Sequence, residues 1–142
     1  IDYVIKTYEK IISKNNISIK FNKTDNFKII GDRDKLIEIF TNLIDNSIKY
    51  SDKNKEITIT AKKDGEFNTV SVADQGIGIP KESIHRITER FFTVDPSKSR
   101  SVGGTGLGLA IVKHLVSQHR AEMDINSVEN EGTTIDIKFN SL

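Results

Sequence analysis

Apolar residues recur along the chain with two periods, and segments of the two kinds alternate. Four segments have the spacing or the start signals of helices: residues 1–13, 32–50, 80–90 and 106–119. Six shorter segments have strand character: residues 17–21, 27–30, 57–61, 69–73, 122–127 and 133–139. Strands interleaved with helices predict an α/β fold, a two-layer sandwich in which a mixed sheet of about five strands packs on about three helices.

For the first two predicted helices, the sequence also indicates which side chains face the core and which residue forms the N-cap. The first helix is expected to place one group of side chains toward the core: Val4, Ile5, Tyr8, Ile11 and Ile12. Asp32 or Asp34 is expected to cap the second helix, because a carboxylate accepts hydrogen bonds from the first backbone amides of a helix.

The size and composition of the chain narrow its class. With 142 residues, 36% hydrophobic and 29% charged, the chain is expected to form one globular domain. A net charge of +1 gives no reason to expect contact with nucleic acid or with a membrane surface. The chain has no cysteine, which excludes disulfides, thiolate metal sites and cysteine nucleophiles. It begins at Ile1 instead of methionine, so we expect it to be a piece of a longer protein.

A glycine-rich segment, residues 103–108, stands directly before an apolar helical run. Four glycines fall within these six residues. Glycine lets backbone amides approach an anion closely, and the helix N-terminus adds a partial positive charge. The pattern predicts a phosphate-binding loop, although it lacks the Lys-Ser/Thr pair of a Walker loop. A flexible loop before a helix is the alternative for this motif alone.

A polar stripe follows one side of the helix predicted over residues 32–50. Glu38, Asn42, Asn46 and Lys49 are spaced by three or four residues and therefore share one face. Asparagine amide oxygens are suitable ligands for Mg²⁺, and the Lys49 ammonium suits a phosphate oxygen. The alternative is a solvated polar face.

The segment from Asp74 to Pro80 carries the third pattern. Asp74 has the strand parity of Val70 and Val72 and stands at the end of their strand, beside Gly76 and Gly78. A carboxylate in such a pocket can accept a hydrogen bond from the exocyclic amine of adenine, a charge-assisted bond. Apolar walls would come from Ile77 and Ile79. An acidic turn before a proline-initiated helix is the alternative.

Taken together, the order and spacing of these motifs resemble one family over essentially the whole chain. The chain resembles the catalytic and ATP-binding domain of bacterial sensor histidine kinases, which has the Bergerat fold also seen in gyrase, Hsp90 and MutL. Five segments carry the likeness, to the N, G1, F, G2 and G3 boxes of the family in that order: residues 42–51, 74–79, 89–92, 104–109 and 132–134.

The resemblance implies a role for each residue of the site. Asn46 would hold Mg²⁺, with Asn42 close to the metal and its waters. Lys49 would contact phosphate, Tyr50 would lie along the nucleotide, and Thr133 would line the base pocket. The catalytic set would be Asn42, Asn46 and Lys49. The nucleotide-binding set would be Asn42, Asn46, Lys49, Tyr50, Asp74, Gly76, Ile77, Gly78, Ile79, Phe92, Lys98, Arg100, Gly104, Thr105, Gly106, Leu107, Gly108, Leu109 and Thr133.

The resemblance also implies a lid over ATP, formed by residues 87–104. The glycines would hinge this lid, and Phe91 and Phe92 would anchor it. Its polar, aperiodic composition is typical of an element that closes over a ligand.

The chain departs from the family pattern at several positions. An arginine that reaches the γ-phosphate is replaced by Thr93, so we expect Lys98 and Arg100 to supply the cations of the lid. A common glycine pair is replaced by residues 120–121, where alanine in a left-handed turn would be strained. Asn130 stands for the first glycine of the last motif and can adopt a left-handed conformation.

The activity implied by the resemblance is donation of the γ-phosphoryl group of Mg-ATP to a histidine on a separate helical dimerisation domain. A response-regulator aspartate would receive the group next. Family members that hydrolyse ATP have a glutamate as general base where this chain has Asn42, and an amide cannot act as a base. The alternatives are a serine kinase or anti-sigma factor of the same fold, and a nucleotide-binding regulatory module without transfer.

The resemblance further implies how the chain belongs to a larger protein. His85, His114 and His119 lack the sequence context of an acceptor histidine. We expect all three to be surface or partner-facing residues, and the chain alone not to phosphorylate itself. The acceptor and sensor regions would lie outside it, the chain would be a monomer, and its parent would be a membrane-anchored sensor with this domain in the cytoplasm.

Overall fold

The computed structural model describes residues 1–52, 54–101 and 103–141 and contains a mixed sheet of five strands. The strands are β1 (Ser18–Lys23), β2 (Glu56–Asp64), β3 (Phe67–Ala73), β4 (Glu122–Val128) and β5 (Gly132–Asn140). Their order across the sheet is β1-β2-β3-β5-β4, with β1 parallel to β2 and the other neighbours antiparallel. A parallel pair needs a crossover, and the segment between β1 and β2 contains the longest helix.

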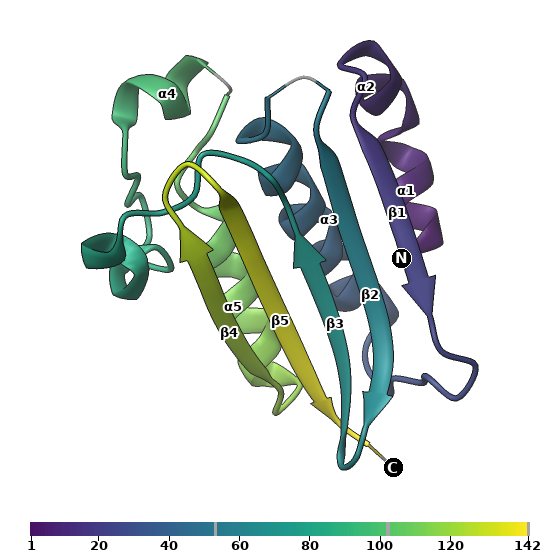
Figure 1. Ribbon diagram of the computed structural model, residues 1–142. Helices are drawn as coiled ribbons and strands as arrows, with labels where there is room; N and C mark the ends of the chain where they lie inside the picture. The colour runs from purple at the N-terminus through teal and green to yellow at the C-terminus, as the bar shows by residue number, and fades with distance from the viewer. Residues whose placement is uncertain (53, 102, 142) are drawn as a thin grey trace.

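The helices that cover the sheet lie on one of its faces (Figure 1). In chain order the helices are α1 (Asp2–Thr7), α2 (Glu9–Lys14), α3 (Arg33–Lys49), the 3-10 helix η1 (Lys81–Arg86), α4 (Pro96–Ser101) and α5 (Gly108–Gln118). α3 and α5 pack against each other, and α1 packs on α3. The predicted two-layer sandwich is therefore confirmed. No helix within the described ranges is long and apolar enough to cross a membrane.

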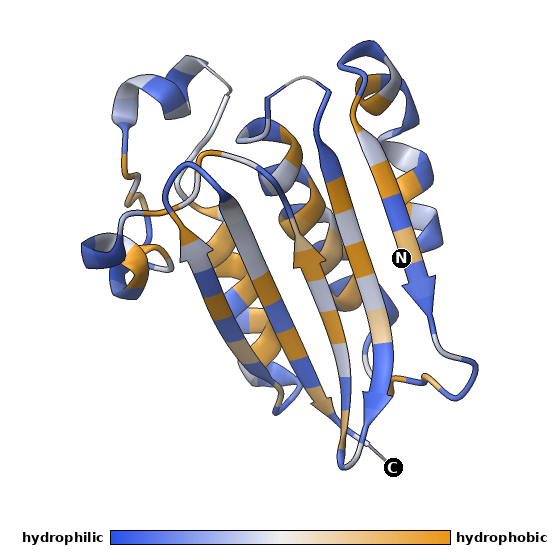
Figure 2. Cartoon of the chain, viewed as in Figure 1, coloured by the Kyte–Doolittle hydropathy of each residue, from blue (hydrophilic) through white to orange (hydrophobic). Residues whose placement is uncertain are grey.

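The core lies between the two layers, and the alternation along the strands creates it (Figure 2). In β2, Ile57, Ile59 and Ala61 are fully buried, while Thr58 and Thr60 between them belong to the opposite face. α3 meets these strands with apolar side chains that are almost completely buried: Ile39, Phe40, Leu43 and Ile44. Complete burial of such a side chain stabilises the fold by about 1.5–3 kcal/mol.

The two central helices have well-defined ends. Asp32 caps α3 as predicted, because its Oδ1 accepts a hydrogen bond from the backbone N–H of Lys35 at 3.0 Å. That bond is the main reason that the pKa of Asp32 is lowered. After α5, Arg120 has a φ of +53°, and Ala121 donates its backbone N–H to the carbonyl of Val116 at 3.1 Å. The residue with the left-handed backbone is thus Arg120, and the prediction of backbone strain at Ala121 is wrong.

The N-terminal segment is not one helix. Tyr8 has φ −98° and ψ 4°, ending α1 and preceding α2. Because the helix axis is interrupted, the helical spacing no longer holds across the break, and Ile11 is 46% exposed instead of facing the core. Val4 is buried as predicted.

Residues 27–30 form no strand. This stretch crosses from the edge strand β1 to α3 without a ladder partner, while Phe27 and Ile29 still pack against the core. Its alternation therefore reflects burial of two side chains without strand pairing.

The two remaining differences lie beside the predicted lid. The helix expected over residues 80–90 is the shorter 3-10 helix η1, held by i to i+3 bonds such as that from Ser83 to Pro80. The segment expected to be aperiodic contains α4, which begins after Asp95. The Asp95 carboxylate accepts hydrogen bonds from the backbone N–H groups of Ser97 and Lys98, and this cap starts the helix.

Candidate functional site

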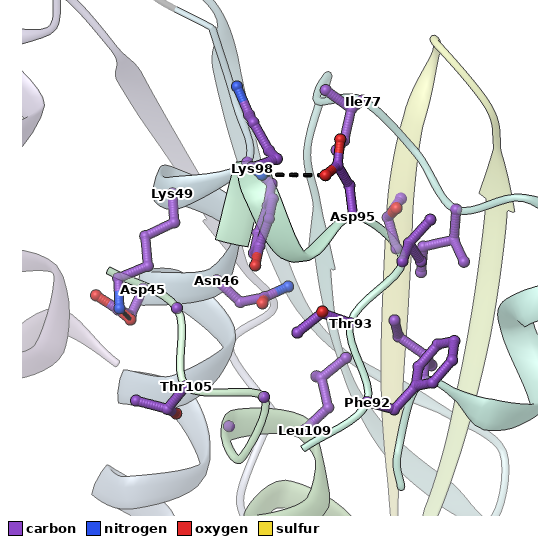
Figure 3. Close-up of a pocket in the computed structure, with 18 of the residues that line it drawn as sticks. Asp45, Asn46, Lys49, Ile77, Phe92, Thr93, Asp95, Lys98, Thr105 and Leu109 are labelled. Carbon is purple, nitrogen blue, oxygen red and sulfur yellow. Dashed lines mark hydrogen bonds and ion pairs between the residues drawn. The ribbon is translucent and has the colours of Figure 1, made fainter. Parts of the chain in front are cut away.

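A cavity of about 140 Å³ lies between the C-terminal half of α3, the loop after β3, the segment that leads into α4 with Lys98 of α4 itself, the glycine-rich loop with the N-terminus of α5, and Thr133 of β5. Figure 3 shows Asn46 at the centre of one wall, with Lys49 and Asp45 together on one side and Thr93 and Phe92 on the other. These segments are far apart in the sequence. Only the packing of α3 on α5 brings the asparagines and the glycine-rich loop together.

Most of the predicted site residues line this cavity. They are Asn42, Asn46, Lys49, Tyr50, Asp74, Ile77, Gly78, Ile79, Phe92, Lys98, Gly104, Thr105, Gly106, Gly108, Leu109 and Thr133. Gly76, Leu107 and Arg100 do not line it. The cavity also includes residues outside the predicted nucleotide-binding set: Asp45 on α3, and Ile87, Thr93, Val94 and Asp95 in the predicted lid.

Asp74 is held at the end of β3 by hydrogen bonds from separate parts of the chain. Its Oδ1 accepts from the backbone N–H of Gly76 at 2.9 Å and of Thr133 at 3.1 Å, and its Oδ2 accepts from the Ser47 hydroxyl at 3.3 Å. Burial raises the pKa of Asp74, and these three hydrogen bonds act in the opposite direction. The result is a fixed carboxylate that can accept a further hydrogen bond from a ligand in the cavity.

The backbone around Asp74 is as tightly placed as its side chain. Gly132 has a φ of +142°, and a Cβ atom there would lie 2.1 Å from the carbonyl oxygen of Asp74. Glycine is therefore required for β5 to pass beside Asp74. Gly76, although outside the lining, contributes its N–H to the carboxylate and so acts through Asp74.

Three residues of the polar stripe of α3, Asn42, Asn46 and Lys49, line the cavity, whereas Glu38 is exposed outside it. The Asn42 side-chain amide donates to the backbone carbonyl of Glu38 at 2.9 Å, so its other end, the oxygen, is directed away from that bond. The Lys49 ammonium lies 2.9 Å from Asp45 and 3.4 Å from the carbonyl oxygen of Gly103. Within the described residues no cluster of three or more histidine, cysteine, aspartate or glutamate side chains is arranged to hold a metal. An amide oxygen is a suitable ligand for a hard cation, and Asn46 lines the cavity.

Of the two cations that the predicted lid was expected to supply, one lines the cavity. Lys98 lines the cavity, whereas Arg100 on the same short helix is exposed outside it. Thr93 places an uncharged side chain on the wall.

The two phenylalanines of the predicted lid, Phe91 and Phe92, have different surroundings. Phe91 has a left-handed backbone with φ +64° and is 74% exposed, and only its N–H is held, by the carbonyl of Gly106 at 2.8 Å. Phe91 is therefore attached through its backbone, and its side chain does not contribute an anchor. Phe92 does line the cavity, with the Arg86 guanidinium 4.5 Å from its ring centroid.

Among the histidines, the structure corrects the prediction for His119. Its Nδ1 is 2.8 Å from the carbonyl of Leu115, and its Nε2 is 3.2 Å from the backbone nitrogen of Asp32. Because a backbone N–H can only donate, Nε2 accepts and Nδ1 carries the proton. His119 thus joins the end of α5 to the start of α3. His85 and His114 are exposed, as predicted.

Two of the residues that the sequence analysis missed had a detectable signal. Ser47 is a polar residue on the buried face of α3, and a buried hydroxyl needs a partner. Asp45 precedes Lys49 by four residues, which is ion-pair spacing on a helix. The signal at Ser47 did not show that its partner is Asp74.

Comparison with known proteins places this geometry in a family. Residues 31–141 match the model of the histidine kinase-, DNA gyrase B- and HSP90-like ATPase family. The chain belongs to this family. It is an ATP-binding domain, and the Bergerat fold predicted from the sequence is confirmed.

Within the family, the relatives are sensor histidine kinases. The chain is 37% identical over 131 residues to the sensor-like histidine kinase SenX3 of Mycolicibacterium smegmatis, covering 92% of this chain and 34% of that protein. It is 42% identical over 106 residues to the sensor histidine kinase WalK of Bacillus subtilis, covering 73% of this chain and 17% of that protein. The chain therefore spans about a third of one relative and less than a fifth of the other.

Solved structures show the same domain. The catalytic domain of the histidine kinase ThkA superposes with a TM-score of 0.84 at 28% identity, covering 98% of this chain and 90% of that one. ThkA in complex with the response regulator TrrA superposes with a TM-score of 0.81 at 25% identity, covering 99% of this chain and 39% of that one. The chain is a catalytic domain of the protein-histidine kinase type.

Proposed function

We propose that this chain binds Mg-ATP and, in its parent protein, donates the γ-phosphoryl group to a histidine on a separate helical dimerisation domain. The observation that carries the proposal is the fixed Asp74 carboxylate on the wall of the cavity. Adenine presents an amine to this acceptor, whereas guanine presents a carbonyl that would repel it. The base therefore lies beside Asp74 and Thr133, and the phosphates extend toward Lys49 and the N-terminus of α5.

The phosphate half of the site supplies positioning and charge. Asn46 would hold the magnesium ion, with Asn42 close to the metal and its waters, and the bound ion would supply positive charge beside the phosphates. Lys49 and Lys98 contact phosphate oxygens, with Lys98 taking the place of the family arginine that is Thr93 here. Arg100 has a lesser part, since it is exposed outside the cavity.

In the transfer step, a nitrogen of the acceptor imidazole attacks the γ-phosphorus. A nitrogen–phosphorus bond forms, the bond to the bridging oxygen breaks, ADP leaves with that electron pair, and the imidazole loses its proton to solvent. Asn42 cannot activate water as a carboxylate would, which favours transfer over hydrolysis. A response-regulator aspartate accepts the group next, a partner suggested by the ThkA–TrrA complex. The parent is a membrane-anchored sensor that carries this domain in the cytoplasm.

One observation favours a second candidate, a nucleotide-binding regulatory module without transfer. Thr93 leaves the lid with one cation fewer than the family pattern. Adding a separate acceptor domain and assaying acid-labile phosphohistidine separates the two functions, because only the kinase forms it.

Calorimetric titration with a non-hydrolysable ATP analogue, with and without Mg²⁺, tests the binding site. The native chain should bind at micromolar concentrations, more tightly with Mg²⁺, and GTP should not compete. Asp74→Asn should abolish binding. Lys98→Ala should weaken binding several-fold, and Arg100→Ala on the same helix is its matched control. Failure of the native chain to bind the analogue under either condition would refute the proposal.

A further inference from the structure

The helix of the predicted lid, α4, has little packing of its own. It has six residues, Pro96–Ser101, and of these Ser99 is the buried one. A helix of this length is unstable alone in water, because nucleation costs more than so few hydrogen bonds return. Contacts at its two ends must therefore hold it in place, and they decide which of its side chains meet the cavity.

The Asp95 side chain provides the contact at the N-terminal end. Its Oδ1 accepts hydrogen bonds from the backbone N–H groups of Ser97 at 3.0 Å and of Lys98 at 3.2 Å, and the second of these bonds is drawn in Figure 3. Its backbone carbonyl accepts from the N–H of Ser99 at 2.9 Å, as the carbonyl of an N-cap residue does. Pro96, with its fixed φ, stands at the first helical position and favours the helix further.

The C-terminal end of α4 is held against α3. Gly104 donates its backbone N–H to the carbonyl of Ser99 at 2.7 Å. A Cβ atom on Gly104 would lie 2.5 Å from the Ser99 hydroxyl oxygen and 2.9 Å from the Tyr50 hydroxyl oxygen, so the missing side chain allows this close approach. The helix is therefore fixed at both ends, and it cannot turn about its axis without breaking one set of contacts.

This attachment selects one of two cations. Lys98 and Arg100 are two residues apart, about 200° around a helix, so they lie on nearly opposite sides. Lys98 lines the cavity, and Arg100 is exposed outside it. The selection matters in this chain because Thr93, where the family pattern has an arginine, brings no charge to the cavity wall.

We propose that Asp95 is a positioning residue for Lys98: by capping α4 it holds this lysine, and not Arg100, on the side of the lid that meets the phosphate groups of a nucleotide. The inference rests on the proposed function in taking Lys98 as a phosphate contact. Asp95 acts through the helix, because its Oδ1 is occupied by two backbone N–H groups.

Charge and positioning predict opposite results when the Asp95 carboxylate is removed. The carboxylate lines the cavity, and a negative charge beside phosphates repels them, so charge alone predicts tighter binding for every neutral replacement. Positioning predicts that the kind of replacement matters. Asparagine and serine cap helices about as well as aspartate does, whereas alanine does not.

Calorimetric titration with the ATP analogue and with adenosine tests the proposal, and thermal unfolding shows that each variant is folded. Asp95→Ala should weaken analogue binding by about threefold to fivefold, the range for loss of one N-cap, and by no more than Lys98→Ala does. Asp95→Asn and Asp95→Ser should bind the analogue at least as tightly as the native chain. Adenosine has no phosphate, so its affinity should stay unchanged in all three variants. Asp64→Ala, which removes the same charge from the exposed end of β2, is the matched control.

A double variant places the effect on Lys98. In a Lys98→Ala background, Asp95→Ala should have no further effect on analogue binding, because the group that the cap positions is gone. Unchanged or tighter analogue binding in Asp95→Ala, weaker binding in Asp95→Asn, or an equal loss for adenosine would overturn the inference while leaving ATP binding by the native chain intact. No analogue binding by the native chain would instead refute the proposed function, and this inference with it.

Discussion

The two halves of the cavity are built differently. On the base side, the Asp74 carboxylate accepts three hydrogen bonds, from the loop after β3, from β5 and from α3. On the lid side, α4 is a single short helix with Ser99 as its buried residue, and Phe91 is held through its backbone alone. The side proposed to bind the base is therefore preorganised before a ligand arrives, whereas the side proposed to bind phosphate depends on a few contacts that can be rearranged.

A glycine-to-alanine substitution on each side of the cavity should reveal the difference most clearly, as a difference in the free energy of unfolding. Gly132→Ala puts a Cβ 2.1 Å from the Asp74 carbonyl oxygen in a backbone with φ +142°, whereas at Gly103, with φ +76°, nothing lies within 4 Å. We expect a loss of about 3 kcal/mol or more in the free energy of unfolding for Gly132→Ala. For Gly103→Ala we expect about 1 kcal/mol, from backbone strain alone.

Denaturant titration of the two variants measures both losses. Equal losses would show that the lid end is packed as rigidly as the base side, against the comparison. A soluble but unfolded Gly132→Ala chain would agree with the larger value.

Asp74→Asn should have opposite effects on ligand binding and on stability: it should abolish binding but raise the free energy of unfolding. Because burial raises the pKa of Asp74 in the folded chain, the ionised carboxylate reduces stability at neutral pH. Asparagine removes that charge and can keep the acceptor for Gly76 and Thr133, so the variant should gain about 1 kcal/mol in unfolding free energy.

The gain in Asp74→Asn should depend on pH in a definite direction. A group with a raised folded-state pKa contributes stability that increases as the pH falls through that pKa, because the folded state then takes up the proton more readily than the unfolded state. The native chain should therefore approach the variant in stability as the pH falls below neutral. Thermal unfolding of both proteins over that range measures the difference, and a gap that widens toward acid would contradict the assignment.

The smallest effect is expected at Phe91. Its side chain is 74% exposed, so Phe91→Ala should change the unfolding free energy by less than about 0.5 kcal/mol. Phe92→Ala, the matched substitution one residue on, should cost more because Phe92 lines the cavity and packs on Arg86. A large loss in Phe91→Ala would show that its side chain anchors the lid after all.

The sequence predicted the strands of the hairpins and narrowed the cap of α3 to Asp32 or Asp34, because each depends on neighbours within a few residues, and the alternation of these elements predicted the sandwich. It also named most residues that line the cavity, because each motif has its own local pattern. The strand at residues 27–30 failed because burial of Phe27 and Ile29 imitates strand alternation. The single N-terminal helix failed because a break at Tyr8 leaves no mark in the spacing.

The roles of particular polar side chains were harder to predict, because they depend on contacts between distant segments. Ser47 looked like one more position on the core face until β3 placed Asp74 opposite it. His119 looked exposed until the start of α3 met its ring. Phe91 looked like an anchor until its left-handed backbone turned the ring outward.

The sequence by itself determined which elements form and which chemistry each motif offers, because periodicity, capping and residue type are local properties. Only the tertiary structure decided which of those groups meet: the donors that fix Asp74 come from residues 47, 76 and 133. The physical reason is that the orientation and the pKa of a carboxylate depend on its burial and its hydrogen-bond partners, and both are set when distant segments pack together.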